Sequence, residues 1–314
     1  MCSSDLTEVD APEPVAEPGA AEAYVAHLVA ALEGRRLDGL RVVVDCGNGA
    51  ASAVAPAALR ALGAEVEVLH DAPDGRNIND GCGSTDPEPL ARAVVASGAD
   101  VGLAFDGDAD RIVMVDAAGA VVDGDEILAV LALDLDARGH LAGRAVVSTV
   151  MANLGLRRAL AAHGIDFVET PVGDRYVRAA MDDRGLVLGG EQSGHVILAE
   201  HAATGDGTLT GIVVLDVVVR AQRTFADLAA VVTKAPQCLR NVRVADRSGL
   251  DAAAGFWAEV ADLEAELGDR GRVLVRPSGT EPVVRVMVEA LEPGAAEAGA
   301  DRLAAALTQA LGPA

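Results

Sequence analysis

The chain has 314 residues, which is enough for two or three domains rather than one compact module. Hydrophobic residues make up 51% and aromatic residues only 2%, so the cores must be built from Ala, Val and Leu. The formal net charge of -23 argues against a nucleic-acid backbone or an anionic membrane as the main partner. Because Lys234 is the only lysine, an anion site must use arginine, backbone amides and helix N-termini.

The cysteines and the apolar runs bear on the setting of the protein. The four cysteines lie far apart without a zinc-type spacing, which favours a reduced, cytoplasmic environment. Asp134 and Asp216 interrupt the longest apolar runs, so no membrane span is expected, and no secretory signal is visible. Five histidines sit in no cluster and are assigned surface or helix-end positions: His27, His70, His140, His163 and His201.

Residues 1–18 contain three prolines and acidic residues without periodicity, and are expected to form an irregular tail. Apolar strands, Gly/Asn/Asp turns and Ala/Leu helices then alternate, which predicts βαβ units and a mainly parallel sheet. The expected strands of this first part cover 41–45, 65–69, 101–105 and 111–115, and its helices cover 19–32, 50–62, 86–97 and 124–137. The turns CGNGA at 46–50 and NINDGCGST at 77–85 are interpreted as Asn and Gly adopting positive φ.

The alternation restarts near His140 and changes after Pro236. We therefore predict two consecutive α/β domains with mainly parallel sheets, at 19–138 and 139–234, followed by a smaller C-terminal α+β two-layer domain at 235–314. The expected strands cover 144–149, 166–170 and 186–190, then 239–244, 271–276 and 283–289; the helices cover 153–163, 174–184 and 206–221, then 250–267 and 295–311.

Three aspartates follow the strand at 101–105 at alternate positions, in the sequence Asp106-Gly107-Asp108-Ala109-Asp110-Arg111. Gly107 and Ala109 permit a tight curve on which the carboxylates converge on one cation. Oxygen ligands at the carboxyl end of a parallel strand favour Mg²⁺. An acidic surface turn is the alternative, and a calcium loop is less favoured because the EF-hand spacing and terminal Glu are missing.

A second polar loop, GGEQSGH at 189–195, also follows an apolar strand. Glu191, Ser193 and His195 offer donors and acceptors to several hydroxyl or amino groups, as a sugar requires. The nucleophile elbow GxSxG is absent, which argues against a hydrolase, and a plain polar hairpin is the alternative. Asp174 and Arg175 begin a helix after a strand and are candidates for orienting an anion, with a helix cap as the alternative.

The third loop is RPSGTEP at 276–282, with Arg285 following it. A Ser/Gly/Thr turn with flanking arginines is a candidate phosphate site, although it is no Walker A loop. A hairpin with solvent-facing arginines is the alternative. The residues predicted to bind phosphate are Arg276, Ser278, Gly279, Thr280 and Arg285.

Together, DGDADR, GEQSGH and RPSGTEP, in that order and at those separations, resemble the α-D-phosphohexomutase superfamily from about Gly19 to Leu311. The VGDRYV, NINDGCGST and AATGDG segments are similar to its glucosamine-phosphate branch. The resemblance implies transfer of phosphate between O6 and O1 of glucosamine phosphate through a 1,6-bisphosphate. The alternatives are an enzyme for glucose or mannose phosphates, a non-catalytic sugar-phosphate binding protein and, less favoured, a phosphatase with Asp106 as nucleophile.

The resemblance also implies roles for the residues of these loops. Asp106, Asp108 and Asp110 would hold Mg²⁺, and Arg111 would face the phosphate as the catalytic arginine. Glu191 and Ser193 would hold the sugar, with His195, Asp174 and Arg175 also assigned to substrate binding. Hexosamine phosphate and its bisphosphate are the expected partners, without nucleic acid or membrane, and the oligomeric state is left open, with a homodimer as one alternative.

One feature of the resembling family is missing from the sequence. That family carries its phosphorylated serine in a Ser-His-Asn-Pro setting within a first domain, and no such motif occurs in these 314 residues. Asp86 also stands where a histidine is expected. We therefore expect a chain that corresponds to three of four domains, truncated before them, and that does not complete turnover alone.

Overall fold

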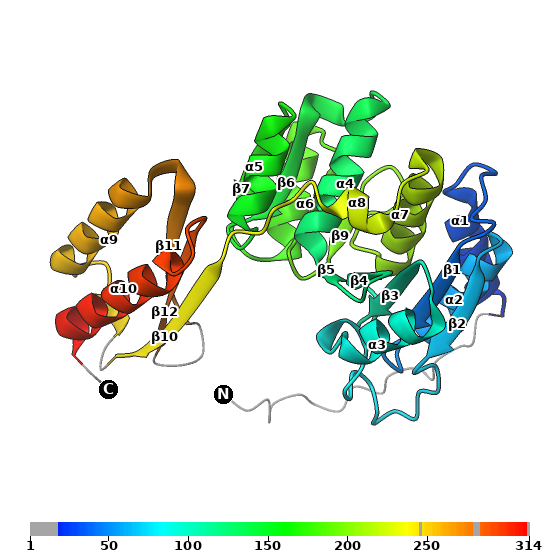
Figure 1. Ribbon diagram of the computed structural model, residues 1–314, viewed down its shortest axis with the longest axis horizontal. Helices are drawn as coiled ribbons and strands as arrows, with labels where there is room; N and C mark the ends of the chain where they lie inside the picture. Colours follow the sequence, from blue (N-terminus) through cyan, green and yellow to red (C-terminus); the bar gives the residue numbers. More distant parts are fainter. Residues whose placement is uncertain (1–17, 245–246, 279–282, 313–314) are drawn as a thin grey trace, which may run out of the picture.

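The computed structural model describes residues 18–244, 247–278 and 283–312. Three sheets follow one another along this chain (Figure 1). The first has the order β2-β1-β3-β4-β5, in which β1 pairs in parallel with β2 and β3, while β4 and β5 extend it in antiparallel fashion. Its strands are β1 (Arg41–Asp45), β2 (Glu65–Leu69), β3 (Val101–Phe105), β4 (Ile112–Asp116) and β5 (Val121–Val122).

Helices cover both faces of the first sheet. Successive side chains of a strand point to opposite faces, so Val42 and Val44 pack towards α1, α2 and α7, whereas Val43 and Val115 pack towards α3. Burial on both sides explains why β1 and β3 read as continuous apolar runs. The helices are α1 (Ala20–Ala30), α2 (Ala51–Ala61), α3 (Glu88–Ser97) and α7 (Gly207–Ala221).

The second sheet has the order β7-β6-β8-β9, parallel except for the β8–β9 pair. Helix α6 covers one face; α4 and α5 cover the other, and α8 packs on α4. Because α7 contacts α4, β9 and the first sheet, the first two sheets share one apolar core. The elements are β6 (Ala145–Thr149), β7 (Asp166–Thr170), β8 (Leu188–Gly190), β9 (Val196–Leu198), α4 (Gly124–Ala137), α5 (Leu154–Ala162), α6 (Asp174–Arg184) and α8 (Phe225–Ala229).

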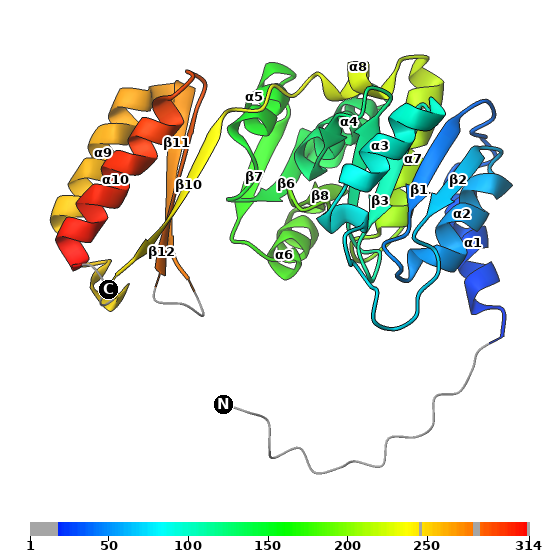
Figure 2. The ribbon, with the colours of Figure 1, turned by 60° about the horizontal axis from the view of Figure 1, so that its bottom comes forward.

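The third sheet is antiparallel, with the order β10-β12-β11, and has its own core against α9 and α10. This unit lies at the opposite end of the molecule from the first sheet (Figure 2). Its elements are β10 (Gln237–Arg243), β11 (Gly271–Pro277), β12 (Val283–Ala290), α9 (Ala254–Leu267) and α10 (Ala295–Leu311). Single-turn helices lie at Gly83–Thr85, Ala142–Arg144, Arg247–Gly249 and Gly268–Arg270.

The predicted fold class is confirmed, and every predicted helix and strand is present within a few residues of its expected bounds. The strands β5 and β9 and the helix α8 were not expected, because segments of two to five residues are too short to show a periodicity. Within the described part of the chain, none of the helices combines the length and apolar character needed to cross a membrane. The domain boundaries at residues 138 and 234 stay predictions.

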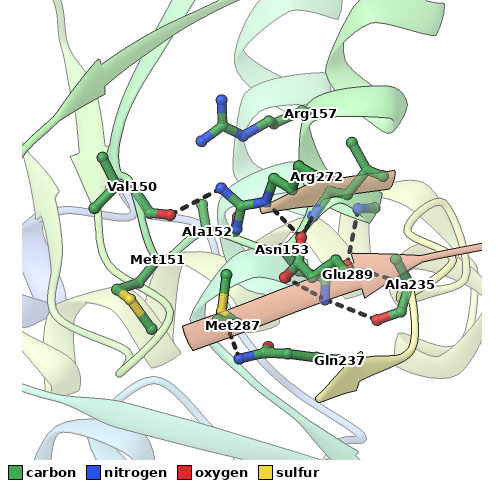
Figure 3. A network of polar contacts seen from close by, with 12 residues as sticks. Val150, Met151, Ala152, Asn153, Arg157, Ala235, Gln237, Arg272, Met287 and Glu289 are labelled. Atoms are coloured by element: carbon green, nitrogen blue, oxygen red, sulfur yellow. Dashed lines mark hydrogen bonds and ion pairs between the residues drawn. The ribbon is translucent and has the colours of Figure 1, made fainter. Parts of the chain in front are cut away.

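A buried polar network joins the third sheet to the second (Figure 3). The fully buried Glu289 of β12 accepts hydrogen bonds from Leu154 N at 2.9 Å and from Asn153 Nδ2 at 3.3 Å. The same carboxylate pairs with Arg272 of β11, whose Nε lies 2.6 Å from it. The Arg272 guanidinium also donates to the carbonyl oxygens of Val150 and Ala152, at 2.8 and 2.6 Å. The Glu289–Arg272 ion pair of the third sheet therefore receives its remaining hydrogen bonds from groups that belong to the second sheet and its helix α5.

Asn153 connects this network to the linker and to α4. Its Oδ1 accepts from Gly155 N at 2.8 Å, which caps α5, and from Ala235 N at 2.9 Å, which fixes the chain just before β10. Its own N–H donates to Asp125 Oδ2 at 2.7 Å. One side chain therefore sets where the chain leaves the second sheet.

Asp125 should make stability depend on pH. Burial raises the pKa of its carboxyl to about 8, and the neighbouring Asp123 adds to the shift. The unfolded chain loses this proton near its ordinary pKa of about 4, so between about pH 4 and 8 the folded state holds the extra proton. Stability should therefore fall as pH rises through this window. Asp125→Asn stays neutral, so we expect calorimetry to show a drop in Tm across this window that is smaller by several degrees than in the wild type. Parallel curves of Tm against pH for the two proteins would contradict this.

Candidate functional site

The connection from β3 to β4 forms a tight acidic loop. Asp106 is fully buried at the end of β3, and Ala109 takes a left-handed φ of 60° that turns the chain back. Carboxylate oxygens of Asp106, Asp108 and Asp110 all lie within 4.8 Å of one another. Asp108 is exposed and Asp110 half-buried, so the group opens to solvent on one side. Three converging carboxylates suit a hard divalent cation such as Mg²⁺.

Arg111 faces the same carboxylates. Its backbone N–H donates to Asp106 Oδ1 at 3.1 Å, and its guanidinium forms ion pairs with Asp106 and Asp110. Burial raises the pKa of the Asp106 carboxyl, and the hydrogen bond and charge of Arg111 oppose that shift. One arginine against three carboxylates leaves net negative charge in the loop. The donor set and its charge therefore fit the cation that the sequence predicts.

The loop Glu191–Gly194 connects β8 to β9 and lies against the acidic loop. Ile112 N donates to Gly194 O and Gly124 N donates to Gln192 O, both at 3.1 Å. Arg111 and His195 form an isolated antiparallel bridge that continues β4. Because the Arg111–His195 bridge and the Ile112–Gly194 hydrogen bond join the two loops, the groups predicted to bind sugar and metal are held side by side.

His195 is almost fully buried between the two loops. Gly205 N donates to its Nε2 at 3.1 Å, so the ring proton sits on Nδ1, which lies 3.1 Å from Asp110 Oδ2. The ring therefore orients one of the predicted metal ligands. Sequence reasoning did not foresee this contact; the AATGDG segment at 202–207, which supplies Gly205, was its only signal. A contact of His195 with sugar stays a prediction.

Glu191 links the loop to the start of α6. Its Oε1 accepts from Gly173 N at 3.1 Å, next to Asp174 and Arg175, which are exposed. The Arg175 guanidinium lies over the Tyr176 ring, 4.5 Å from its centroid, and donates to the Tyr176 hydroxyl. Ser193 is exposed at the tip of the sugar loop. These groups share one edge of the second sheet, where β8 and β7 end.

Arg276 and Arg285 are direct cross-strand partners in β11 and β12. Like charges placed opposite each other are unfavourable, and among the described residues neither guanidinium has a carboxylate partner. An anion between them would relieve the repulsion. Ser278 is buried and its N–H donates to Val283 O at 2.8 Å. Gly279 and Thr280, also predicted to bind phosphate, lie outside the described residues.

Gly194 provides a test of how the sugar loop is held. Its φ is 92°, and a Cβ at this position would lie 1.9 Å from Ile112 O, the carbonyl of an adjacent backbone. We expect Gly194→Ala to lower the free energy of unfolding by about 2–4 kcal/mol and to push the loop away from β4. Gly255→Ala is the matched control, since no atom lies within 4 Å of its Cβ. Equal urea-unfolding curves for the two variants would contradict this packing.

Sequence models of one family match three successive parts of the chain: phosphoglucomutase/phosphomannomutase alpha/beta/alpha domain II at residues 22–119, alpha/beta/alpha domain III at 123–235 and the C-terminal domain at 239–306. The chain therefore belongs to the phosphoglucomutase/phosphomannomutase family. Among its relatives are phosphoglucosamine mutases of Kineococcus radiotolerans, 55% identical over 93% of this chain, and Frankia alni, 56% identical over 94%. The chain spans 64% and 65% of the length of these two proteins.

Solved structures agree in fold. A phosphoglucomutase/phosphomannomutase family protein from Burkholderia thailandensis superposes with a TM-score of 0.76 at 25% identity, covering 92% of this chain and 64% of that one. An Aspergillus fumigatus N-acetylphosphoglucosamine mutase in complex with GlcNAc-6P and magnesium has a TM-score of 0.73 at 24% identity, covering 92% and 66%. The resemblance read from the three loops is confirmed.

Proposed function

We propose that this chain binds a hexosamine phosphate together with Mg²⁺ and takes part in moving phosphate between O6 and O1 of glucosamine phosphate. The observation that carries the proposal is the direct contact between the acidic loop and the sugar loop, through the Ile112–Gly194 hydrogen bond and the His195–Asp110 contact. The names of relatives at 52–56% identity support glucosamine as the sugar. The proposal includes a cytoplasmic setting and a homodimer.

The residues divide the work as follows. Asp106, Asp108 and Asp110 would hold Mg²⁺, which when bound neutralises charge on a transferring phosphoryl group. Arg111 donates hydrogen bonds to the phosphoryl oxygens from the same loop. Glu191 accepts from a sugar hydroxyl or amino group.

The paired arginines bind the phosphate that is not transferred. Arg276 and Arg285 present two guanidinium groups from neighbouring strands, which suits charge-assisted hydrogen bonds to phosphate oxygens. Holding this remote phosphate orients the sugar, and orientation contributes much of the rate in such transfers. The sequence holds no Ser-His-Asn-Pro motif, which carries the phosphoserine in the resembling family, so the test of turnover includes an added phosphoserine donor.

Calorimetric titration with glucosamine 6-phosphate in the presence of Mg²⁺ tests the proposal. We expect binding by the chain alone, weaker binding of the 6-phosphates of glucose and mannose, and no conversion to the 1-phosphate without an added phosphoserine donor. Preference for glucose or mannose phosphate would instead favour a phosphoglucomutase or phosphomannomutase. Absence of binding to all three sugar phosphates would overturn the proposal.

Arg276→Ala should separate binding from folding. Arg276 is half-buried and has no ion-pair partner among the described residues, so its loss should leave Tm nearly unchanged. Loss of a charge-assisted contact to phosphate of about 1.5–3 kcal/mol corresponds to roughly 10- to 150-fold weaker binding. Arg270→Ala, which removes an exposed arginine of the same domain paired with Glu292, is the control and should leave binding unchanged. A large drop in the Tm of Arg276→Ala together with its weaker binding would count against a direct role of Arg276 in phosphate binding.

A further inference from the structure

Asp45, His70 and Cys82 converge at the edge of the first sheet, although 25 and 12 residues separate them. One carboxylate oxygen, one ring nitrogen and the sulfur all lie within 4.8 Å of one another. The sequence analysis placed His70 in no cluster, at a surface or helix-end position, and found no zinc-type spacing among the cysteines. The structure corrects the first of these for His70, which lies in a cluster with Asp45 and Cys82.

The parallel pairing of β1 and β2 brings the first two together. Asp45 is the last residue of β1 and lies opposite Leu69, the last residue of β2, so His70 follows at the same edge. Parallel strands end at the same edge however long the helix between them is. This is why sequence spacing gave no sign of the cluster.

A glycine-dependent loop carries Cys82 to this edge. A Cβ on Gly83 would lie 2.3 Å from Phe105 O, so the loop can pack this closely only with glycine there. Asn79 N donates to Gly47 O at 2.9 Å, and Asn48 Nδ2 contacts Cys82 Sγ at 3.8 Å. The sulfur is therefore positioned by two loops and is itself buried.

Two polar atoms in the cluster are left without hydrogen bonds. Asp45 is fully buried; its Oδ1 accepts from Gly47 N at 3.0 Å, while its Oδ2 lies 3.0 Å from His70 Nδ1. Neither Asp45 Oδ2 nor His70 Nδ1 makes a contact with hydrogen-bond geometry to the described residues. The buried Asp45 carboxylate therefore keeps a hydrogen bond on Oδ1 alone, and a cation bound to Asp45 Oδ2 and His70 Nδ1 would compensate the charge that burial makes costly.

The surroundings also favour a cation over a neutral cluster. Asp80 and Asp86 stand two residues before and four residues after Cys82, so further carboxylates lie close to the cluster along the chain. The three side chains of the cluster include no lysine or arginine, and a bound metal would supply positive charge as the thiol releases a proton to solvent. His70 is about one third exposed, which leaves a path for an ion to enter.

We propose that Asp45, His70 and Cys82 form a second metal site, which takes a divalent ion of the zinc class. Carboxylate oxygen, imidazole nitrogen and thiolate sulfur are the ligands of zinc, and three of them leave a fourth tetrahedral position for water. Sulfur and nitrogen donors select against Mg²⁺, which prefers the all-oxygen loop of Asp106.

A metal in this second site would stabilise the backbone of the acidic loop. Ala50 N donates to Gly107 O at 2.9 Å, and a Cβ on Gly49 would lie 2.3 Å from the same oxygen. A metal that ties the ends of β1 and β2 to the Cys82 loop would therefore fix the backbone on which Gly107 rests. This stabilisation does not depend on the sugar or on the reaction proposed above.

Cobalt(II) titration of the reduced, chelator-treated full chain tests the second site. We expect one equivalent of Co²⁺ to give a thiolate-to-cobalt charge-transfer band and tetrahedral d–d bands, to raise Tm, and to be displaced by Zn²⁺ but not by excess Mg²⁺. Cys82→Ser should abolish the charge-transfer band, and His70→Asn should abolish the tetrahedral d–d bands. Cys238→Ser, a cysteine of β10, is the matched control and should keep both, as should Asp108→Asn.

The outcomes decide between the alternatives. Absence of a charge-transfer band in the wild type, or a band that persists in Cys82→Ser, overturns the proposal. A band lost in Cys238→Ser places the thiolate elsewhere and overturns it as well. Circular dichroism of each variant checks that a lost band does not reflect unfolding. Sugar-phosphate binding is measured separately, so failure of the mutase proposal leaves this test intact.

Discussion

Glutamine in place of Glu289 is expected to lower the free energy of unfolding by about 3 kcal/mol or more. The change removes the fully buried charge that faces the Arg272 guanidinium, which is itself only 16% exposed. It also replaces one of the two carboxylate oxygens by an NH₂ group, so either Leu154 N or Asn153 Nδ2 loses its acceptor. Breaking a buried pair on one side is costly because it leaves the other charge uncompensated.

The measurement can follow the third sheet by itself. Trp257 of α9 is the single tryptophan of the chain, so its fluorescence reports on this unit, while circular dichroism reports on the whole chain. We expect the fluorescence transition of Glu289→Gln to move to lower urea. Glu292→Gln is the control, because Glu292 forms an exposed ion pair with Arg270 and should cost no more than about 1 kcal/mol. Equal transitions for the two variants would show that the network contributes little.

The sequence predicted the strand ends well because each motif follows an apolar run. Asp106 follows β3 and Glu191 follows β8, and both strands are buried on two faces and therefore easy to recognise. The pairing of the two loops could not be predicted in this way. It depends on the bridge between Arg111 and His195, which are 84 residues apart, and on β9, which has only three residues.

The polar contacts between the second and third sheets could not be predicted from the sequence either. Glu289 lies in an apolar strand, where a lone carboxylate gives no sign of whether it faces solvent or a partner. Its partners come from α5, its N-terminal cap and β11, and only the docking of the third sheet makes them neighbours. His70 shows the same limit, since the register of β1 against β2 determines what it meets.

Asparagine in place of Asp108 should weaken Mg²⁺ binding by at least about 100-fold, since even outer partners of metal ligands contribute 10- to 100-fold. Asp108 is exposed and makes no hydrogen bond or ion pair with the described residues, so no structural role is lost. Its negative charge helps to raise the pKa of the Asp106 carboxyl, which is the mark of repulsion within the loop. Without metal the variant should therefore be as stable as the wild type or slightly more stable.

Asp108→Asn is therefore expected to weaken Mg²⁺ binding while keeping or slightly raising the stability of the metal-free protein. This combination distinguishes a metal ligand from a surface carboxylate. Wild-type Tm should rise on adding Mg²⁺, because a ligand that binds only the folded state stabilises it, whereas Asp108→Asn should show almost no rise. Asp183→Asn removes an exposed carboxylate from α6 and should keep the full response. Calorimetric titration gives the affinities directly. If Asp108→Asn bound Mg²⁺ as tightly as Asp183→Asn, the acidic loop would be a surface turn, and the assignment of Asp106, Asp108 and Asp110 as metal ligands would have to be withdrawn.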